Sequence, residues 1–373
     1  MTMAERWRAH WRNMKKEYLA LLWLGGAYLL LRLAMALPGA AALLCTWVTG
    51  PYKRLMGTLC SYLPFSMAEV CWAALVLFCV WYAARTVYRA VKVKQGRGLY
   101  LWRRLAGAAA IALAVYLGYT FLWGLNYYAP TFEQQSGIYA QAITVEELND
   151  TTGYFAAVLN RTAGSVPRDE NGIFAVSSEE VLARGDTLYT ALERRWPFLQ
   201  GPQVRPKAMV FSEVMSAIQF TGFFFPFTGE ANLNVNAPVC LLPATVAHEL
   251  AHVRGIAPEQ TANFLAVVAC QESGDVWYEY SGALLAYIHL SNALYGEDKG
   301  LWDAIYHGLD PRVQADLQDN NAYWAQYQDT HLSKAANSAY EGFLKSYGQS
   351  LGVKSYGAVV DLLAAYYGPS AKG

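Results

Sequence analysis

Five consecutive residues have the types and spacing of a metal-dependent hydrolase. The segment His248-Glu249-Leu250-Ala251-His252 places two histidines four residues apart, with a glutamate directly after the first. In a helix, this spacing puts both imidazole rings on one face. Imidazole nitrogens suit Zn²⁺, and a catalytic zinc site keeps one position open for water. Glu249 would accept a proton from that water.

The surrounding residues predict the helix that this spacing requires. Leu242, Pro243 and Ala244 suit a helix start, and an apolar helical pattern continues to His252. A chance match and a buried structural histidine pair are the alternatives. Polar side chains buried in one apolar helix need partners, which a metal ion supplies. We therefore expect bound zinc with His248 and His252 as ligands.

A third protein ligand is needed, and two glutamates are candidates. Gly255 can turn the chain, and a second helix starting shortly afterwards would return Glu259 to the histidines. Asn263, one turn after Glu259, could orient a ligand histidine through a hydrogen bond. Glu272 is the alternative. Its separation from His252 along the sequence is similar to that between the second histidine and the third ligand in thermolysin-like enzymes. The sequence favours Glu259.

A predicted strand at residues 230–235 carries alternating polar side chains, from Glu230, Asn232 and Asn234. Zinc peptidases commonly bind extended substrate along a sheet edge. The strand is therefore either a substrate-binding edge or a structural hairpin beneath the HExxH helix. A tyrosine near the C-terminus could donate to an oxyanion. The candidates are Tyr340, Tyr347 and Tyr356.

The composition places part of the chain in a membrane. At 54% hydrophobic and 16% charged residues, the 373-residue chain is too apolar for an ordinary soluble enzyme. Three apolar stretches, each near the length that a membrane-spanning helix needs, cover residues 18–37, 64–84 and 105–127. The first is an uncleaved anchor, because its core is long and lacks a small-residue cleavage site.

Basic residues indicate the orientation of these spans. Only Lys53 and Arg54 lie between the first two stretches, whereas seven basic residues lie between the second and third: Arg85, Arg89, Lys92, Lys94, Arg97, Arg103 and Arg104. The positive-inside rule places the N-terminus in the cytoplasm. Three crossings then carry everything after Tyr128 to the extracytoplasmic side.

The remaining residues, 129–373, have the mixed composition of a globular domain. Capping-box pairs at Thr144 and Ser177 predict helices over Val145–Thr162 and Ser178–Arg195. Short strands at 207–212 and 230–235 predict a small sheet, separated by an aromatic, turn-rich run at 221–229. The pattern of residues 267–367 predicts helices. We expect a mainly α membrane domain at 1–128, followed by an α+β domain with a small sheet.

The remaining candidates are isolated residues. Cys240 and Cys270 flank the HExxH segment and could pair in an oxidising compartment, or could be buried apolar thiols. Surface or helix-capping positions are expected for His289, His307 and His331. With a net charge of zero, the chain has no overall positive charge that would attract nucleic acid, so a nucleic acid partner is not expected. The expected partners are the lipid bilayer and a peptide or protein substrate, and the oligomeric state stays open.

Several motifs together resemble a bacterial membrane family known as domain of unknown function 3810. They are Trp123–Tyr128, Phe225–Asn232, His248–Gly255 with Glu259, Ala262, Asn263 and Phe264, Tyr280–Gly282, and Gly352–Gly357. The resemblance implies three transmembrane helices in a bacterial cell membrane and a zincin-like outer domain of the gluzincin type. The segment from Glu259 to Asn263 is also similar to the ExxAD or ExxAN helix of HExxH peptidases, with a shorter gap, which implies Glu259 as a ligand.

The sequence therefore predicts a membrane-anchored zinc metallopeptidase that hydrolyses peptide bonds outside the cytoplasm. Its metal ligands would be His248, His252 and Glu259, and Glu249 would be the catalytic base. A zinc hydrolase acting on a non-peptide bond is a second possibility. The contrasting hypothesis is a membrane-anchored sensory or partner-binding protein with structural zinc and no peptidase activity.

Overall fold

The computed structural model describes residues 2–347 and 356–371, and the chain divides into two compact units. One unit contains Met1–Thr49 and Glu69–Ala129, and the other contains Gly50–Ala68 and Pro130–Gly373. The units therefore interleave along the chain. The segment between the first two apolar stretches packs with the larger, C-terminal part.

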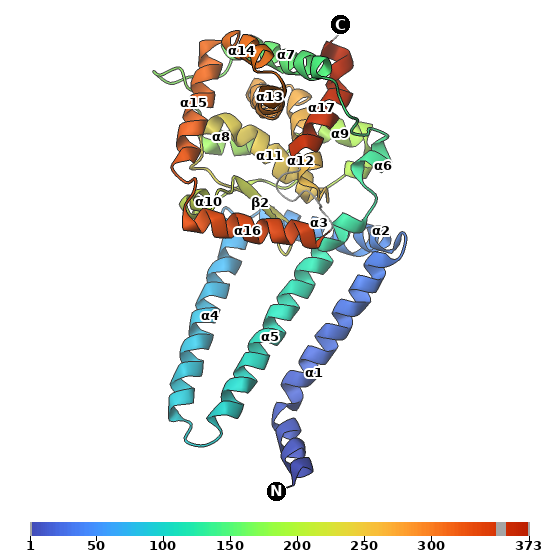
Figure 1. The fold of residues 1–373 in the computed structure, drawn as a ribbon, viewed down its shortest axis with the longest axis vertical. Coiled ribbons are helices and arrows are strands. Elements are labelled where there is room, and N and C mark those ends of the chain that lie inside the picture. Colours follow the sequence, from blue (N-terminus) through green and yellow to red (C-terminus); the bar gives the residue numbers. More distant parts are fainter. Residues whose placement is uncertain (1, 348–355, 372–373) are drawn as a thin grey trace. The chain divides into compact units, whose positions relative to one another are not determined.

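The first unit consists mainly of long apolar helices, α1 (Met3–Ala36), α4 (Met67–Lys92) and α5 (Arg97–Leu122) (Figure 1). Stretches long and apolar enough to cross a membrane are His10–Ala36 and all of α4 and α5. The prediction of three candidate spans is confirmed. The third ends at Leu122, earlier than expected, because the chain tightens into a 3₁₀ turn at Gly124–Tyr128.

The second unit is mainly helical, and its core is a group of mutually packed helices. They are α7 (Val145–Thr162), α11 (Leu242–Val253), α12 (Glu259–Gln271), α13 (Val276–Glu297) and α17 (Tyr356–Ala371). In Figure 1, α13 is seen end on within this group. Buried aromatic side chains of α13, including Tyr278, Tyr280 and Tyr287, fill the core. Because α13 packs against both α11 and α12, it fixes the positions of these two helices.

Further helices surround this core. They are α3 (Gly50–Ser61), α6 (Phe132–Ser136), α8 (Ser178–Ala183), α9 (Thr190–Arg195), α10 (Ser212–Ala217), α14 (Lys299–His307), α15 (Pro311–Ala325) and α16 (His331–Ser346). Both predicted capping boxes form, at Thr144 and Ser177. The single predicted helix over 178–195 is wrong. A Cβ atom on Gly185 would lie 2.9 Å from Val246, so the chain passes close to α11 here and the helix breaks into α8 and α9.

A three-stranded mixed sheet packs against α11. Its order is β1 (Lys207–Ala208), β3 (Glu230–Leu233), β2 (Gly222–Phe225), with β1 parallel and β2 antiparallel to β3. The strand predicted at 207–212 is shortened because α10 begins at Ser212. The run predicted as turn-rich contains β2.

The predicted edge strand at 230–235 is wrong in its position, because β3 is the central strand of the sheet. Its polar side chains are buried and hydrogen-bonded within the second unit. Asn232 accepts from Ser66 Oγ at 2.6 Å, and Asn234 donates to Ser216 Oγ at 2.9 Å. Glu230 accepts from the backbone N–H groups of Met67 and Ala68. The structural hairpin beneath the HExxH helix is the arrangement present.

Candidate metal centre

Helix α11 presents His248 and His252 side by side. The ring centroids are 4.6 Å apart and the ring planes are nearly perpendicular. His248 Nδ1 lies 2.7 Å from Asn263 Oδ1, and His252 Nδ1 lies 2.6 Å from the carbonyl oxygen of Ile256. Both partner atoms are acceptors, so both Nδ1 atoms carry the proton and donate. Each Nε2 is then the ring atom that could bind a metal, and the expected Asn263 contact is present.

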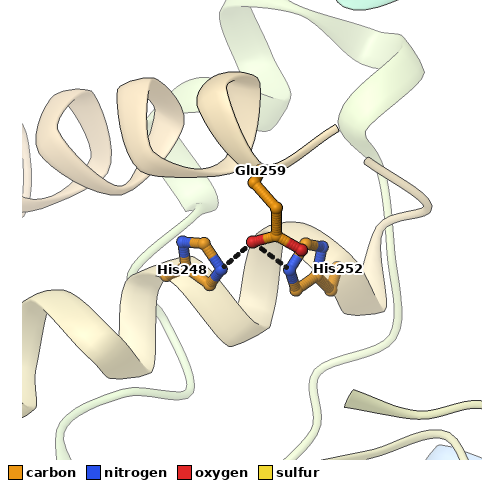
Figure 2. A group of neighbouring side chains, drawn as sticks. All are labelled: His248, His252 and Glu259. Carbon is orange, nitrogen blue, oxygen red and sulfur yellow. Dashed lines mark ion pairs between the residues drawn. The ribbon is translucent and has the colours of Figure 1, made fainter. Parts of the chain in front are cut away.

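A tight turn after α11 brings Glu259 to the same place. Gly255 adopts a φ of +88°, which reverses the chain, and Glu259 is the first residue of α12. Its Oε2 lies 3.1 Å from Nε2 of His248 and 3.6 Å from Nε2 of His252 (Figure 2). Glu272 lies at the opposite end of α12 and pairs with Arg195.

The three side chains fit a zinc ion. Their ligand atoms all lie within 4.8 Å of one another. Ligands of tetrahedral zinc, at bond lengths of about 2.0–2.2 Å, would be about 3.3 Å apart, which is close to the two separations involving Glu259. The exposed fractions of 16% for His248, 7% for His252 and 25% for Glu259 show that the cluster is partly accessible to solvent.

Glu249 lies beside this cluster and is 3% exposed. Its Oε2 is buried and has no hydrogen-bond partner among the described residues. An unsatisfied buried acceptor of this kind indicates a place for a polar group that binds there. Burial raises the pKa of Glu249 to about 7, although the charges of His248 and His252 lower it.

In the metal-free protein, the charges of the cluster are coupled. Burial lowers the pKa of His252, but attraction and hydrogen bonding to Glu259 outweigh this effect and raise it to about 9. Burial raises the pKa of Glu259, yet His252 and His248 hold it well below its usual value. The cluster therefore keeps a carboxylate beside a protonated imidazole until a cation replaces the proton.

A family model described as a protein of unknown function (DUF3810) matches residues 50–364. The chain belongs to this family. Neither the search of curated proteins nor the search of solved structures found a match. The match contains the HExxH helix and Glu259. The family has no established function, so the side chains of this DUF3810 member are the indication of its chemistry.

Tyr340 is the C-terminal tyrosine that the structure brings to the cluster. Its hydroxyl group, on α16, donates a hydrogen bond to Oε1 of Glu259. Tyr347 is buried, and its ring lies beside that of Phe343. Tyr356 begins α17, and its side chain lies outside the described residues, as do Gly352–Ser355 of the family motif. Tyr340 was one of three tyrosines predicted as candidates, and the sequence could not select it because the contact joins segments 81 positions apart in the chain.

Two further residues lie near the cluster. The predicted surface or helix-capping position of His289 is wrong, because this residue in the middle of α13 is half-buried and lies within electrostatic range of His248. Burial, with repulsion from His248, lowers its pKa to about 4. Gly222 on β2 lies directly against the carboxylate of Glu249. Neither has a local sequence signal. His307 and His331 are exposed, as expected, and Cys240 and Cys270 are buried free thiols.

Proposed function

We propose that this protein is a membrane-anchored zinc metallopeptidase that hydrolyses peptide bonds on the extracytoplasmic side. The observation that carries the proposal is the buried, unsatisfied Oε2 of Glu249 beside three converging ligand atoms. A purely structural site has no use for a base between its two histidine ligands. When bound, zinc would polarise the scissile carbonyl group and lower the pKa of water toward about 7.

The side chains divide the work of hydrolysis. His248, His252 and Glu259 hold the metal, and Asn263 and the carbonyl of Ile256 fix the rings. Glu249 takes a proton from the attacking water as the oxygen–carbon bond forms. It then delivers that proton to the amine nitrogen as the carbon–nitrogen bond breaks.

The position of strand β2 is the reason for proposing a peptide as the substrate. It pairs with β3 along one edge and lies at the border of the three-stranded sheet. An extended peptide could add to the other edge through backbone hydrogen bonds. Because Gly222 of β2 lies against Glu249, a peptide on this edge would pass close to the catalytic carboxylate. This strand replaces β3 as the proposed substrate-binding edge.

The proposed topology places the N-terminus in the cytoplasm and the site outside it. Residues 50–68 and 130–373 pack into one unit, which requires both segments to lie on the same side of the membrane. Crossings by both α4 and α5 satisfy this requirement. The basic residues where α4 ends and α5 begins, from Arg85 to Arg104, then favour a cytoplasmic position for the connection between these helices. An alkaline phosphatase fused after residue 373 should be active, and an inactive, stable fusion would reverse the orientation.

The direct test uses the full chain purified in detergent. Elemental analysis should find one zinc ion per chain in wild type and in Glu249→Gln. A quenched-fluorescence peptide library should be cleaved by wild type and not by Glu249→Gln. Folded wild-type protein without zinc would overturn the metallohydrolase assignment. Bound zinc with no cleavage of any peptide would overturn the peptidase and instead favour a zinc hydrolase acting on a non-peptide bond, or the sensory or partner-binding alternative.

A further inference from the structure

Helix α3 has an exposed stripe that is apolar. The side chains of Tyr52, Leu55 and Leu59 follow one another at spacings of three and four residues, which places them on one face. Tyr62 comes directly after the last residue of the helix, Ser61, and extends the stripe. These four side chains are 36%, 60%, 53% and 82% exposed. The opposite face, with Lys53, Gly57 and Cys60, is buried. The helix therefore packs on its own unit through one face and presents an apolar face outward.

Close backbone contacts fix α3 to the sheet of the second unit. A Cβ atom on Gly57 would lie 3.0 Å from the carbonyl oxygen of Gly229, which precedes β3. A Cβ atom on Gly229, whose φ is +70°, would lie 2.7 Å from the carbonyl oxygen of Lys53. The Arg205 N–H group also donates to Ser61 Oγ at 3.1 Å. The apolar stripe is thus held in a defined position relative to the candidate site.

The chain leads directly from α3 to a candidate membrane span. Only residues 62–66 separate the end of α3 from Met67, where the second span begins. A connection of this length reaches at most about 20 Å. The N–H groups of Met67 and Ala68 donate to the two carboxylate oxygens of Glu230 at 3.1 and 3.0 Å. Strand β3 is therefore hydrogen-bonded to the first two residues of α4, which belong to the second unit.

A second exposed apolar group lies on the same side of this unit. Val210, Phe211 and Val214 are 82%, 51% and 56% exposed, just after β1. In Figure 1, α10, which contains Val214, and α3 both lie along the lower edge of the second unit. The contact between Arg205 and Ser61 joins the chain leading into β1 to the end of α3. Two apolar groups are thereby presented beside the start of a span.

We propose that the apolar stripe of α3, together with Val210, Phe211 and Val214, is inserted into the bilayer interface at the leaflet where the second span begins. The short connection to Met67 keeps the stripe at this depth. Tyrosine and leucine on the exposed face of such a helix suit the boundary between headgroups and hydrocarbon. The surface is thus a lipid-binding surface that holds the second unit on the membrane.

This placement also defines a substrate class, and that step rests on the proposed peptidase function. Strand β2 is the neighbour of β3, about 4.8 Å away, and β3 is bonded to the first two residues of α4. The edge that would bind substrate therefore lies close to the membrane surface. The substrate is a polypeptide anchored in the same membrane, cut within the segment directly outside the bilayer. Anchoring also raises its effective concentration at the site.

Lipid contact is tested without any measurement of activity. Leu55→Cys and Leu59→Cys, each carrying a fluorescent label, are reconstituted as full chains in phosphatidylcholine vesicles. Cys45, Cys71 and Cys79 are replaced by alanine, since the other native cysteines are buried. Thr58→Cys, exposed on the same helix beside the stripe, is the matched control.

Spin-labelled lipid should quench the labels at 55 and 59, and iodide in the water should not. The label at 58 should respond more to iodide and less to the lipid than either of them. Iodide quenching at 55 and 59 equal to that at 58 would overturn the lipid contact, whatever the protein does as an enzyme.

The substrate class is tested in the same vesicles with one peptide sequence in three forms. The peptide is free in solution, or attached to a membrane anchor by a linker of about five or about forty residues, which spans at most about 18 or 140 Å. The short-linked form should be cleaved at least tenfold faster than the free form, and Glu249→Gln should cleave none. Cleavage of the long-linked form alone, or equal rates for all three, would overturn the juxtamembrane assignment. Failure of all three with zinc bound would reject the peptidase, while the label experiment still decides the lipid contact.

Discussion

Gly222 at the start of β2 lies directly against Glu249 of the HExxH helix. A Cβ atom on Gly222 would be 2.6 Å from Oε1 of Glu249 and 2.8 Å from its Cγ. Because the glutamate is buried, its side chain has little room to move away. The position of the proposed base is therefore set in part by the absence of a side chain on a neighbouring strand.

Gly222→Ala should displace the Glu249 carboxylate and lower peptide turnover by about 10²-fold while bound zinc is retained. Turnover and zinc content of the full chain in detergent test this expectation. Gly153→Ala on α7, where nothing lies within 4 Å of the added atom, is the control and should keep wild-type turnover. Wild-type turnover in Gly222→Ala would contradict the role assigned to this contact.

The third ligand can be assigned by comparing two glutamates on one helix. Glu259→Gln should lose zinc, because Glu259 contacts both histidines, whereas Glu272→Gln should keep it. Asn263→Ala should weaken zinc binding by about 10–100-fold, since it frees the ring of His248. Zinc content after dialysis against a chelator measures all three. The reverse pattern for the two glutamates would assign the ligand to Glu272.

Zinc binding should depend on pH through His252. Below its raised pKa of about 9, this imidazole is protonated in the metal-free protein, and zinc binds the neutral ring. Binding near neutral pH should therefore release a proton, and the affinity should rise with pH until it levels off above about 9. Calorimetry in two buffers with different ionisation enthalpies counts the protons. An affinity that does not change between neutral pH and the raised pKa would contradict this coupling.

Tyr340 is expected to donate a hydrogen bond during turnover, because its hydroxyl group already reaches the carboxylate of a ligand. Tyr340→Phe should keep zinc and lower kcat by about 10²-fold, the usual effect of removing one oxyanion donor. The control is Tyr366→Phe. The hydroxyl group of Tyr366 contacts Glu272, at the opposite end of α12 from Glu259. Equal kcat values in the two variants would exclude a catalytic part for Tyr340.

Glu230 should matter for stability. Glu230→Ala leaves the buried N–H group of Ala68 without its acceptor, at a cost of about 1–3 kcal/mol, and removes the acceptor of the partly buried N–H group of Met67. The melting temperature of the full chain in detergent should fall clearly, and less in Glu230→Gln, which keeps one acceptor oxygen. Glu170→Ala, at an exposed loop position, should leave it unchanged. An unchanged melting temperature in Glu230→Ala would show that these bonds contribute little.

Local patterns in the sequence were enough for the candidate spans, the HExxH helix and both capping boxes. A span depends on the length of an apolar stretch, and a capping box joins residues three positions apart, at Thr144 and Ser177. The turn at Gly255 and the contact of Asn263 with His248 could also be predicted from the sequence. They involve helices that follow each other directly, so the spacing limits the geometry.

Tertiary structure decided what depends on contacts between distant segments. The predicted helix over 178–195 breaks where Gly185 packs against Val246, and β3 is central because β1 pairs with it from the other side. Two further features depend on contacts between segments more than seventy residues apart. Tyr340 contacts Glu259 across 81 positions, and α3 packs on the sheet through Gly57 and Gly229. Propensity and periodicity report on neighbours along the chain. Such pairings depend instead on how the whole unit packs its core.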